Sequence, residues 1–109
     1  MKKLISKSST GEIIKLFEKC NLEWYFWEGK AYNQMCDVRF TGSVIAVSYK
    51  DQNGDYAIFK GKRTGKGHYE LTAPEINGKA TLHRGPRTKI LEGYWQEDDD
   101  KGMWRIHLY

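Results

Sequence analysis

The residues best suited to chemistry in this chain are three histidines and a carboxylate that share one face of the predicted sheet. His68, His83, His107 and Glu92 come together there when the strands are paired by their apolar alternation. Two histidines and a carboxylate can bind a metal ion or exchange protons. Opposed acid–base pairs are also ordinary on a solvated sheet surface, where they give modest stabilisation. Since no serine or cysteine nucleophile accompanies them in a triad order, we predict a non-enzymatic protein without a catalytic residue, metal site or cofactor.

A basic, glycine-rich loop at residues 60–67 is the second candidate. Glycines let a backbone approach an anion closely, and cations attract it over a longer distance. The loop is not a P-loop, because Lys66 is followed by Gly67 and a strand follows where a helix is needed. It is either a solvated hairpin loop or a clamp for a phosphorylated ligand. In the second case the contacting residues are Lys60, Lys62, Arg63 and Lys66.

Aromatic side chains are the third candidate, because the chain holds seven tyrosines, four tryptophans and four phenylalanines. The predicted register turns five of them into the interior: Tyr49, Tyr56, Tyr69, Trp95 and Trp104. Ala80 and Gly93 are expected to face each other beside these rings, which would leave space for a ligand. Tyrosine hydroxyls need hydrogen-bond partners, and rings around a void suit a planar, partly polar ligand. The alternative is a filled aromatic core whose hydroxyls reach the rim.

Consecutive antiparallel strands must position these residues, and the apolar alternation predicts which residues face one another. The expected pairs include Val47 with Ile58, Tyr69 with Leu82, and Trp95 with Trp104. Because side chains alternate with a period of two, a slip of one position would move a strand's apolar set to the wrong face. The predicted strands cover residues 34–40, 43–50, 55–62, 67–72, 78–84, 89–97 and 102–108. An aromatic segment at residues 23–27 is the first strand, and which of its sides faces inward stays open.

The segment before these strands is predicted to be a helix over residues 9–20, after a flexible tail at residues 1–8. Ser9 and Glu12 fit a capping box at its start. Ile13, Phe17 and Cys20 fall on one stripe at helical spacing. The helix would close one open end of the sheet structure or lie across its outside.

Eight short strands with short connections predict an all-β fold, an eight-stranded antiparallel up-and-down barrel with one N-terminal helix. Closure would remove the edge strands that a flat sheet exposes. The length of 109 residues suits a single barrel domain over residues 9–109, helix included. Two neighbouring strands carry an outward apolar patch that the helix or a second copy of the chain should cover. The patch consists of Val44, Ala46, Ala57 and Phe59.

Charge and composition indicate which partners and which cellular compartment to expect. The formal net charge of +4 favours an anionic partner without requiring one. Two cysteines are too few for a disulfide framework, so free thiols in a reducing compartment are expected. No stretch approaches the roughly 18 apolar residues of a membrane span, and the start of the chain lacks an apolar signal core. We therefore predict a cytoplasmic protein without a membrane partner.

The eight-strand meander with a short leading helix resembles lipocalin-like (calycin) barrels, although Leu22-Glu23-Trp24 lacks the glycine that precedes the first-strand tryptophan in that family. The last two strands, residues 91–95 and 102–108, are similar to the closing hairpin of a second group. These are the β-barrel cyclic-nucleotide receptor domains of bacterial antiviral effectors. The shared feature is a Leu-x-Gly-aromatic strand followed by a Gly-x-x-x-Ile-x-Leu strand. This resemblance implies a nucleotide second messenger as ligand, a role in antiviral defence, and a free-standing receptor or scavenger.

The sequence thus predicts a barrel that binds a small anionic or aromatic ligand, with a nucleotide as the first candidate. One alternative is a filled barrel that acts through protein contacts, with the outward apolar patch as a homo-oligomer interface. Another is a binder of single-stranded nucleic acid, because one pair of aromatic residues on the first strand must face outward.

Overall fold

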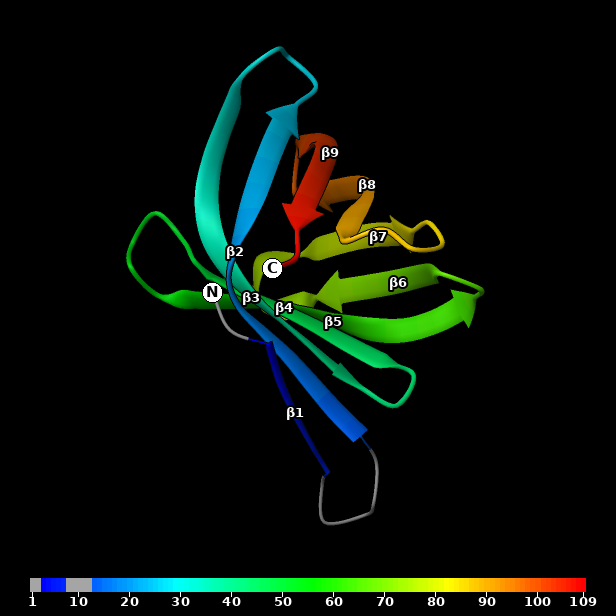
Figure 1. Ribbon diagram of the computed structural model, residues 1–109. Helices are drawn as coiled ribbons and strands as arrows, with labels where there is room; N and C mark the ends of the chain where they lie inside the picture. Colours follow the sequence, from blue (N-terminus) through cyan, green and yellow to red (C-terminus); the bar gives the residue numbers. More distant parts are fainter. Residues whose placement is uncertain (1–2, 8–12) are drawn as a thin grey trace.

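The computed structural model describes the backbone of residues 3–7 and all of residues 13–109, which form one antiparallel sheet (Figure 1). Each strand pairs with the next along the chain, and β2 also pairs with β9. Strands β2 to β9 therefore close into the eight-stranded up-and-down barrel that the sequence predicts. A short 3₁₀-helix, Pro74–Ile76, joins β6 to β7. The strands are β1 (Lys3–Lys7), β2 (Ile13–Phe26), β3 (Ala31–Thr41), β4 (Val44–Lys50), β5 (Tyr56–Gly65), β6 (His68–Ala73), β7 (Gly78–Arg84), β8 (Ile90–Glu97) and β9 (Asp100–His107).

The longest strand, β2, closes the barrel and also extends beyond it. Its first half pairs with β1 and β3, and its second half pairs with β3 and β9. The two halves meet at a bulge between Phe17 and Cys20, where Lys19 has a φ of 54°. The amide of Lys19 donates a hydrogen bond to Asp37 Oδ1 at 2.9 Å. The carboxylate thus satisfies a backbone donor that the irregular ladder would leave without a partner.

The predicted N-terminal helix is wrong where the structure describes it, because residues 13–20 belong to β2. Phe17 and Cys20 both face inward, and the bulge between them inserts one extra residue into the strand. The resulting spacing of three imitates a helical stripe, whereas beyond Cys20 the buried residues alternate strictly. Residues 3–7, predicted to be a flexible tail, form β1. Residues 1–2 and 8–12, also covered by these two predictions, lie outside the described residues.

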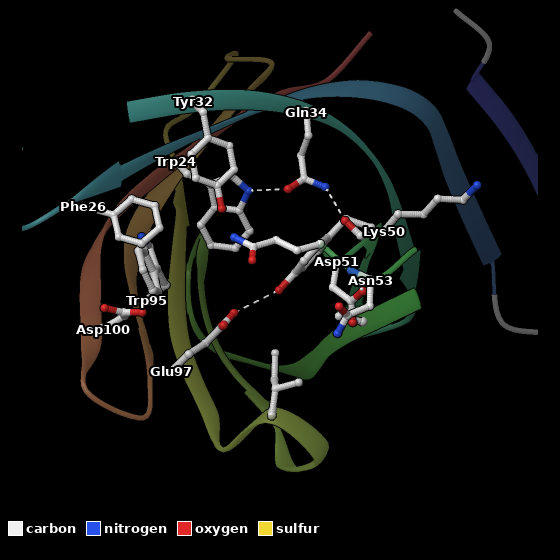
Figure 2. Close-up of a pocket in the computed structure, with 14 residues that line it drawn as sticks. Trp24, Phe26, Tyr32, Gln34, Lys50, Asp51, Asn53, Trp95, Glu97 and Asp100 are labelled. Carbon is white, nitrogen blue, oxygen red and sulfur yellow. Dashed lines mark hydrogen bonds between the residues drawn. The ribbon is translucent and has the colours of Figure 1, made fainter. Parts of the chain in front are cut away.

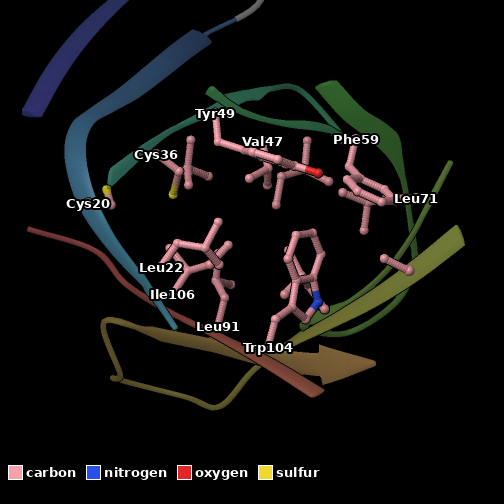
Figure 3. Close-up of a cluster of buried hydrophobic side chains, with 14 of the residues drawn as sticks. Cys20, Leu22, Cys36, Val47, Tyr49, Phe59, Leu71, Leu91, Trp104 and Ile106 are labelled. Atoms are coloured by element: carbon pink, nitrogen blue, oxygen red, sulfur yellow. The ribbon is translucent and has the colours of Figure 1, made fainter. Parts of the chain in front are cut away.

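One continuous apolar core fills most of the barrel (Figure 3). The ring of Trp104 lies 5.4 Å from that of Trp24 and 5.2 Å from that of Phe59, measured between centroids. Its indole Nε1 donates a hydrogen bond to the carbonyl oxygen of Thr81 at 2.9 Å. Trp104 stands opposite Gly93, where a Cβ would collide with the backbone of Thr81. Gly93 therefore permits a close backbone approach, and does not open space for a ligand.

The predicted faces are correct for six of the seven strands from β3 to β9, although the pairing between them is not always as expected. Tyr69 stands opposite Leu82, as predicted. Trp95 stands opposite Gly102, so the predicted Trp95–Trp104 pair is displaced by two residues. A displacement of two keeps every side chain on its predicted face. Most of the predicted interior is accordingly buried.

Strand β5 is the exception, since its register with β4 differs from the prediction by one residue. Val47 pairs with Phe59, so Phe59 is buried and Ile58 is 53% exposed. The connecting loop has five residues and is held by Asp51, whose Oδ1 accepts hydrogen bonds from the amides of Asn53 and Asp55. Both possible faces of β5 contain apolar residues, and the alternation alone could not decide between them.

This register corrects the predicted outward patch. Ala57 and Phe59 lie inside the barrel, so they cannot form an interface between copies of the chain. Val44 and Ala46 do alternate with the buried residues of β4, and both are half-buried. The exposed apolar residue beside them is Ile58, which borders a shallow hollow together with Ala46.

Candidate functional site

A pocket of about 490 Å³ opens at the end of the barrel where β2 joins β3, β4 joins β5, β6 joins β7 and β8 joins β9 (Figure 2). The β4–β5 and β6–β7 connections contribute to its lining, and the adjoining strand ends supply the rest. The lining residues are Trp24, Phe26, Tyr32, Gln34, Tyr49, Lys50, Asp51, Gln52, Asn53, Ala57, Ile76, Trp95, Glu97 and Asp100.

One wall of the pocket consists of aromatic rings. The alternation of β2 turns Trp24 and Phe26 inward, which answers the question that the sequence left open about its first aromatic segment. Phe26 packs edge-on against Trp95, with centroids 4.9 Å apart, and lies 5.6 Å from Tyr32. Trp24 meets Trp95 edge-on at 5.2 Å. Trp24 and Trp95 are buried, while Tyr32 is 43% exposed at the mouth.

Hydrogen bonds hold this wall in place. The indole Nε1 of Trp24 donates to Gln34 Oε1 at 2.8 Å, and Gln34 Nε2 donates to the carbonyl oxygen of Lys50 at 2.9 Å. On the other side, Trp95 Nε1 donates to the carbonyl oxygen of Met103 at 3.0 Å. Both indole donors therefore have fixed partners, and the rings keep their orientation without a ligand.

Carboxylates lie beside this aromatic wall, and Glu97 follows Trp95 on the same strand and face (Figure 2). Glu97 ends β8, and its Oε1 accepts a hydrogen bond from the hydroxyl of Tyr49 at 3.0 Å. Its cross-strand partner is Asp100, the first residue of β9. Burial raises the pKa of Glu97 above its ordinary value, and the charges of Asp100, Asp98 and Asp51 add to this effect against the lowering by Tyr49. The neighbouring carboxylates thus disfavour the charge of Glu97.

The carboxylates also affect the pKa values of the two tyrosines that line the pocket. Burial raises the pKa of the Tyr49 hydroxyl, and the charge of Glu97 raises it further. Burial also raises the pKa of Tyr32, followed by the charges of Glu97 and Asp100. Both tyrosines are therefore neutral hydrogen-bonding groups near neutral pH.

Lys50 lines the pocket with its stem but not with its charge. Figure 2 shows its side chain running away from the pocket. Its ammonium nitrogen lies 5.8 Å from the centroid of the Tyr56 ring. Tyr56 is 66% exposed on the outer face of the barrel, which corrects the prediction that it points inward.

The structure places the remaining predicted ligand-binding residues in three parts of the barrel. Tyr49 and Trp95 line the pocket, whereas Trp104 lies in the packed core. Tyr69 is half-buried near the opposite end, 5.9 Å from Phe40. The basic residues follow β5 away from the pocket into the turn before β6, so the predicted clamp and the pocket lie at opposite ends. They are Lys60, Lys62, Arg63 and Lys66.

Sequence reasoning missed Phe26, Tyr32, Gln34, Glu97 and Asp100. The period of two could have assigned Phe26 once the phase of β2 was known from Cys20 and Leu22. Glu97 and Asp100 gave no such signal, because acidic residues at a turn are typical of a solvated hairpin.

The histidine face is an outer surface with ordinary polar pairs. His107 Nε2 lies 2.8 Å from Glu23 Oε1, and this hydrogen bond lowers the pKa of Glu23. The His68 and His83 rings are neighbours, with centroids 5.7 Å apart. Across residues 13–109 and the backbone of β1, no group of three or more histidine, cysteine or acidic residues could hold a metal ion. The described elements likewise include no helix long and apolar enough to cross a membrane.

Comparisons of the chain with protein-family models, with curated proteins and with solved structures gave no significant match.

Proposed function

We propose that this protein is a non-enzymatic barrel that binds a small organic ligand in the pocket described above, as a receptor or scavenger. The observation that carries the proposal is the convergence of four rings, those of Trp24, Phe26, Tyr32 and Trp95, on one pocket of about 490 Å³. Small-molecule sites commonly have volumes of about 300–1,000 Å³, aromatic walls and a few fixed polar groups.

The arrangement of the barrel supports this role. Its middle is packed by Trp104 and Phe59, and its pocket opens at one end, where strand connections of different lengths meet. A closed eight-stranded barrel is just wide enough to hold one small ligand, as in lipocalins. We therefore keep the resemblance to lipocalin-like barrels as part of the proposal.

A nucleotide second messenger, and with it a role in antiviral defence, stays an alternative within this proposal. Its base could stack on Phe26 or Tyr32 at the mouth of the pocket. Arg63 and Lys66 could not contact its phosphates, because they lie at the other end of the barrel. The protein-interaction module and the single-strand nucleic-acid binder stay predictions from the sequence.

Native mass spectrometry of the full chain, purified gently from its own host, tests the proposal. We expect a complex with one small molecule, which denaturation releases. Tyr32→Ala should weaken the retention of this compound by about tenfold, because an aromatic contact contributes roughly 1–2 kcal/mol. Tyr32 is 43% exposed, so the variant should fold.

The matched control is Tyr94→Ala, which removes a tyrosine on the outer face of β8 with 37% exposure. It should retain the compound as the parent chain does. A bare mass for the parent chain, or equal retention by the two variants, would contradict binding in this pocket.

A further inference from the structure

We infer that the ligand is an organic cation, with an alkylammonium group held between the aromatic rings and the carboxylates of the pocket. This inference rests on the proposed function and specifies the chemical class of its ligand. Four observations carry it: the charge of the lining, the missing counter-ions, the aromatic wall and the orientation of Glu97.

The first observation is the sign of the charge. Asp51, Glu97 and Asp100 line the pocket, and Lys50 is the one basic residue among the described lining residues. The ammonium group of Lys50 lies near the Tyr56 ring and is turned away from the cavity (Figure 2). The whole chain, in contrast, has a formal net charge of +4. The pocket is therefore negative within a positive protein, and its charge cannot be attributed to the overall composition.

The second observation is that these carboxylates have no counter-ion among the side chains that the structure describes. Glu97 and Asp100 stand directly opposite each other in the hairpin of β8 and β9, where like charges destabilise a sheet. Within the described part of the chain, no lysine, arginine or histidine forms an ion pair with Glu97, Asp100 or Asp51. A ligand cation between them would relieve the repulsion that the free protein retains.

The third observation separates an organic cation from a metal ion. The rings of Phe26, Tyr32 and Trp95 cannot ligate a metal, but the face of an aromatic ring attracts an ammonium group and packs against its alkyl substituents. The pocket, at about 490 Å³, is also far larger than a bare ion needs. Rings and carboxylates side by side in one pocket therefore suit a group that is apolar outside and positively charged at its centre.

The fourth observation concerns the geometry of Glu97. The Tyr49 hydroxyl donates to Oε1 of Glu97, and no described donor forms a hydrogen bond with Oε2. Tyr49 thus acts as a positioning residue, which fixes one carboxylate oxygen and leaves the other for the ligand. The raised pKa of Glu97 agrees with this arrangement, because burial and the neighbouring carboxylates both disfavour its charge.

The test compares three probes of different charge on the full chain. Choline is the cation, 3,3-dimethylbutan-1-ol is its uncharged isostere, and guanosine monophosphate is the anion. Binding is followed by nitrogen–proton correlation spectra, in which the indole signals of Trp24 and Trp95 report on the pocket. The indole signals of Trp27, which is 81% exposed, and Trp104, in the core, serve as internal controls.

We expect choline to shift the Trp24 and Trp95 signals and to bind about tenfold more tightly than its isostere, because it gains cation–π and carboxylate contacts. Glu97→Gln should weaken choline binding by about tenfold and leave the isostere unchanged. Raising the salt concentration from about 0.05 M to about 0.5 M should weaken only the binding of choline.

The matched control is Glu70→Gln, the same change of charge at an exposed position of β6, and it should leave choline binding unchanged. Asp100→Asn, at the exposed rim, is a second test variant in case Glu97→Gln fails to fold. If the isostere or the nucleotide binds as tightly as choline, the cation inference is overturned while the binding pocket stands. If no probe shifts the pocket signals, and native mass spectrometry also finds a bare chain, the proposed function fails as well.

Discussion

The side chain of Glu97 connects binding to stability. It is half-buried, faces Asp100 across the hairpin and lies in the field of Asp51, so its charge is disfavoured in the free protein. Such a group lowers the stability of the fold and persists where it serves a function. The hydroxyl of Tyr49 offsets only part of this effect.

Glu97→Gln should therefore stabilise the free protein at neutral pH while it weakens cation binding. The folded-state pKa of Glu97 is raised, so its ionisation destabilises the fold as pH rises above the ordinary carboxyl pKa. The thermal midpoint of the variant should exceed that of the parent chain near pH 7, and the difference should disappear towards about pH 3.5–4. Scanning calorimetry over this range measures it. A variant less stable than the parent at neutral pH would show that the ionised Glu97 side chain does not destabilise the fold.

Individual residues of the site could be predicted only where the period of two applied. Tyr49 and Trp95 lie on strands with clear alternation, and both line the pocket. Glu97 and Asp100 could not be predicted as pocket residues, because this depends on which end of the barrel contains the pocket. Alternation gives the face of a strand but carries no information about its ends.

Two irregular backbone segments, the bulge of β2 and the loop before β5, account for the strands that were predicted wrongly. The bulge of β2 inserts a residue at Lys19, and its free amide is bound by Asp37 from β3. The loop before β5 is closed by the carboxylate of Asp51, which sets the register of that strand. In both segments an aspartate side chain accepts hydrogen bonds from the backbone, one at Lys19 and two in the loop before β5, and neither arrangement leaves a periodic signal in the sequence. The ends of β3 to β9 were predicted to within three residues, whereas most of β2 was not predicted to be a strand.

The register of β5 makes a direct prediction. Ile58→Ala should change the free energy of unfolding by no more than about 0.5 kcal/mol, because Ile58 is 53% exposed. Phe59→Leu should lower it by about 1–2 kcal/mol, since Phe59 is buried and its ring packs against Gly78. Urea denaturation of both variants measures the two values. The opposite order of effects would restore the register that the sequence suggested.

The barrel as a whole depends on its seam, where β2 meets β9. Glu23 and His107 are separated by 84 residues in the chain and by 2.8 Å in space. Leu22 pairs with Ile106 at this seam, and both are fully buried. Contacts between distant parts of a chain require loop closure before they contribute, so the barrel should fold slowly and as one unit. The sequence predicted closure from strand number and short connections, and the pairing of β2 with β9 confirms it.

Leu22→Ala should lower the free energy of unfolding by about 2–4 kcal/mol through the cavity it leaves at the seam. Circular dichroism and tryptophan fluorescence should still report one coincident transition, because no strand of the closed barrel has an independent core. Separate transitions for the two probes would show that the seam opens before the rest of the sheet.

Successive turns lie at alternate ends of the barrel, and the charged residues in these turns differ in sign between the two ends. Three consecutive aspartates, residues 98–100, and Asp51 lie at the pocket end, while exposed Arg63, Lys66 and Arg87 lie at or near the other end. Acidic residues are consequently concentrated at the pocket end and exposed basic residues at the other end. Beside a polyanionic surface the molecule would orient its basic loops towards the surface and its open end towards solution. Such anchoring would leave the pocket free to exchange ligand while the protein is held in place.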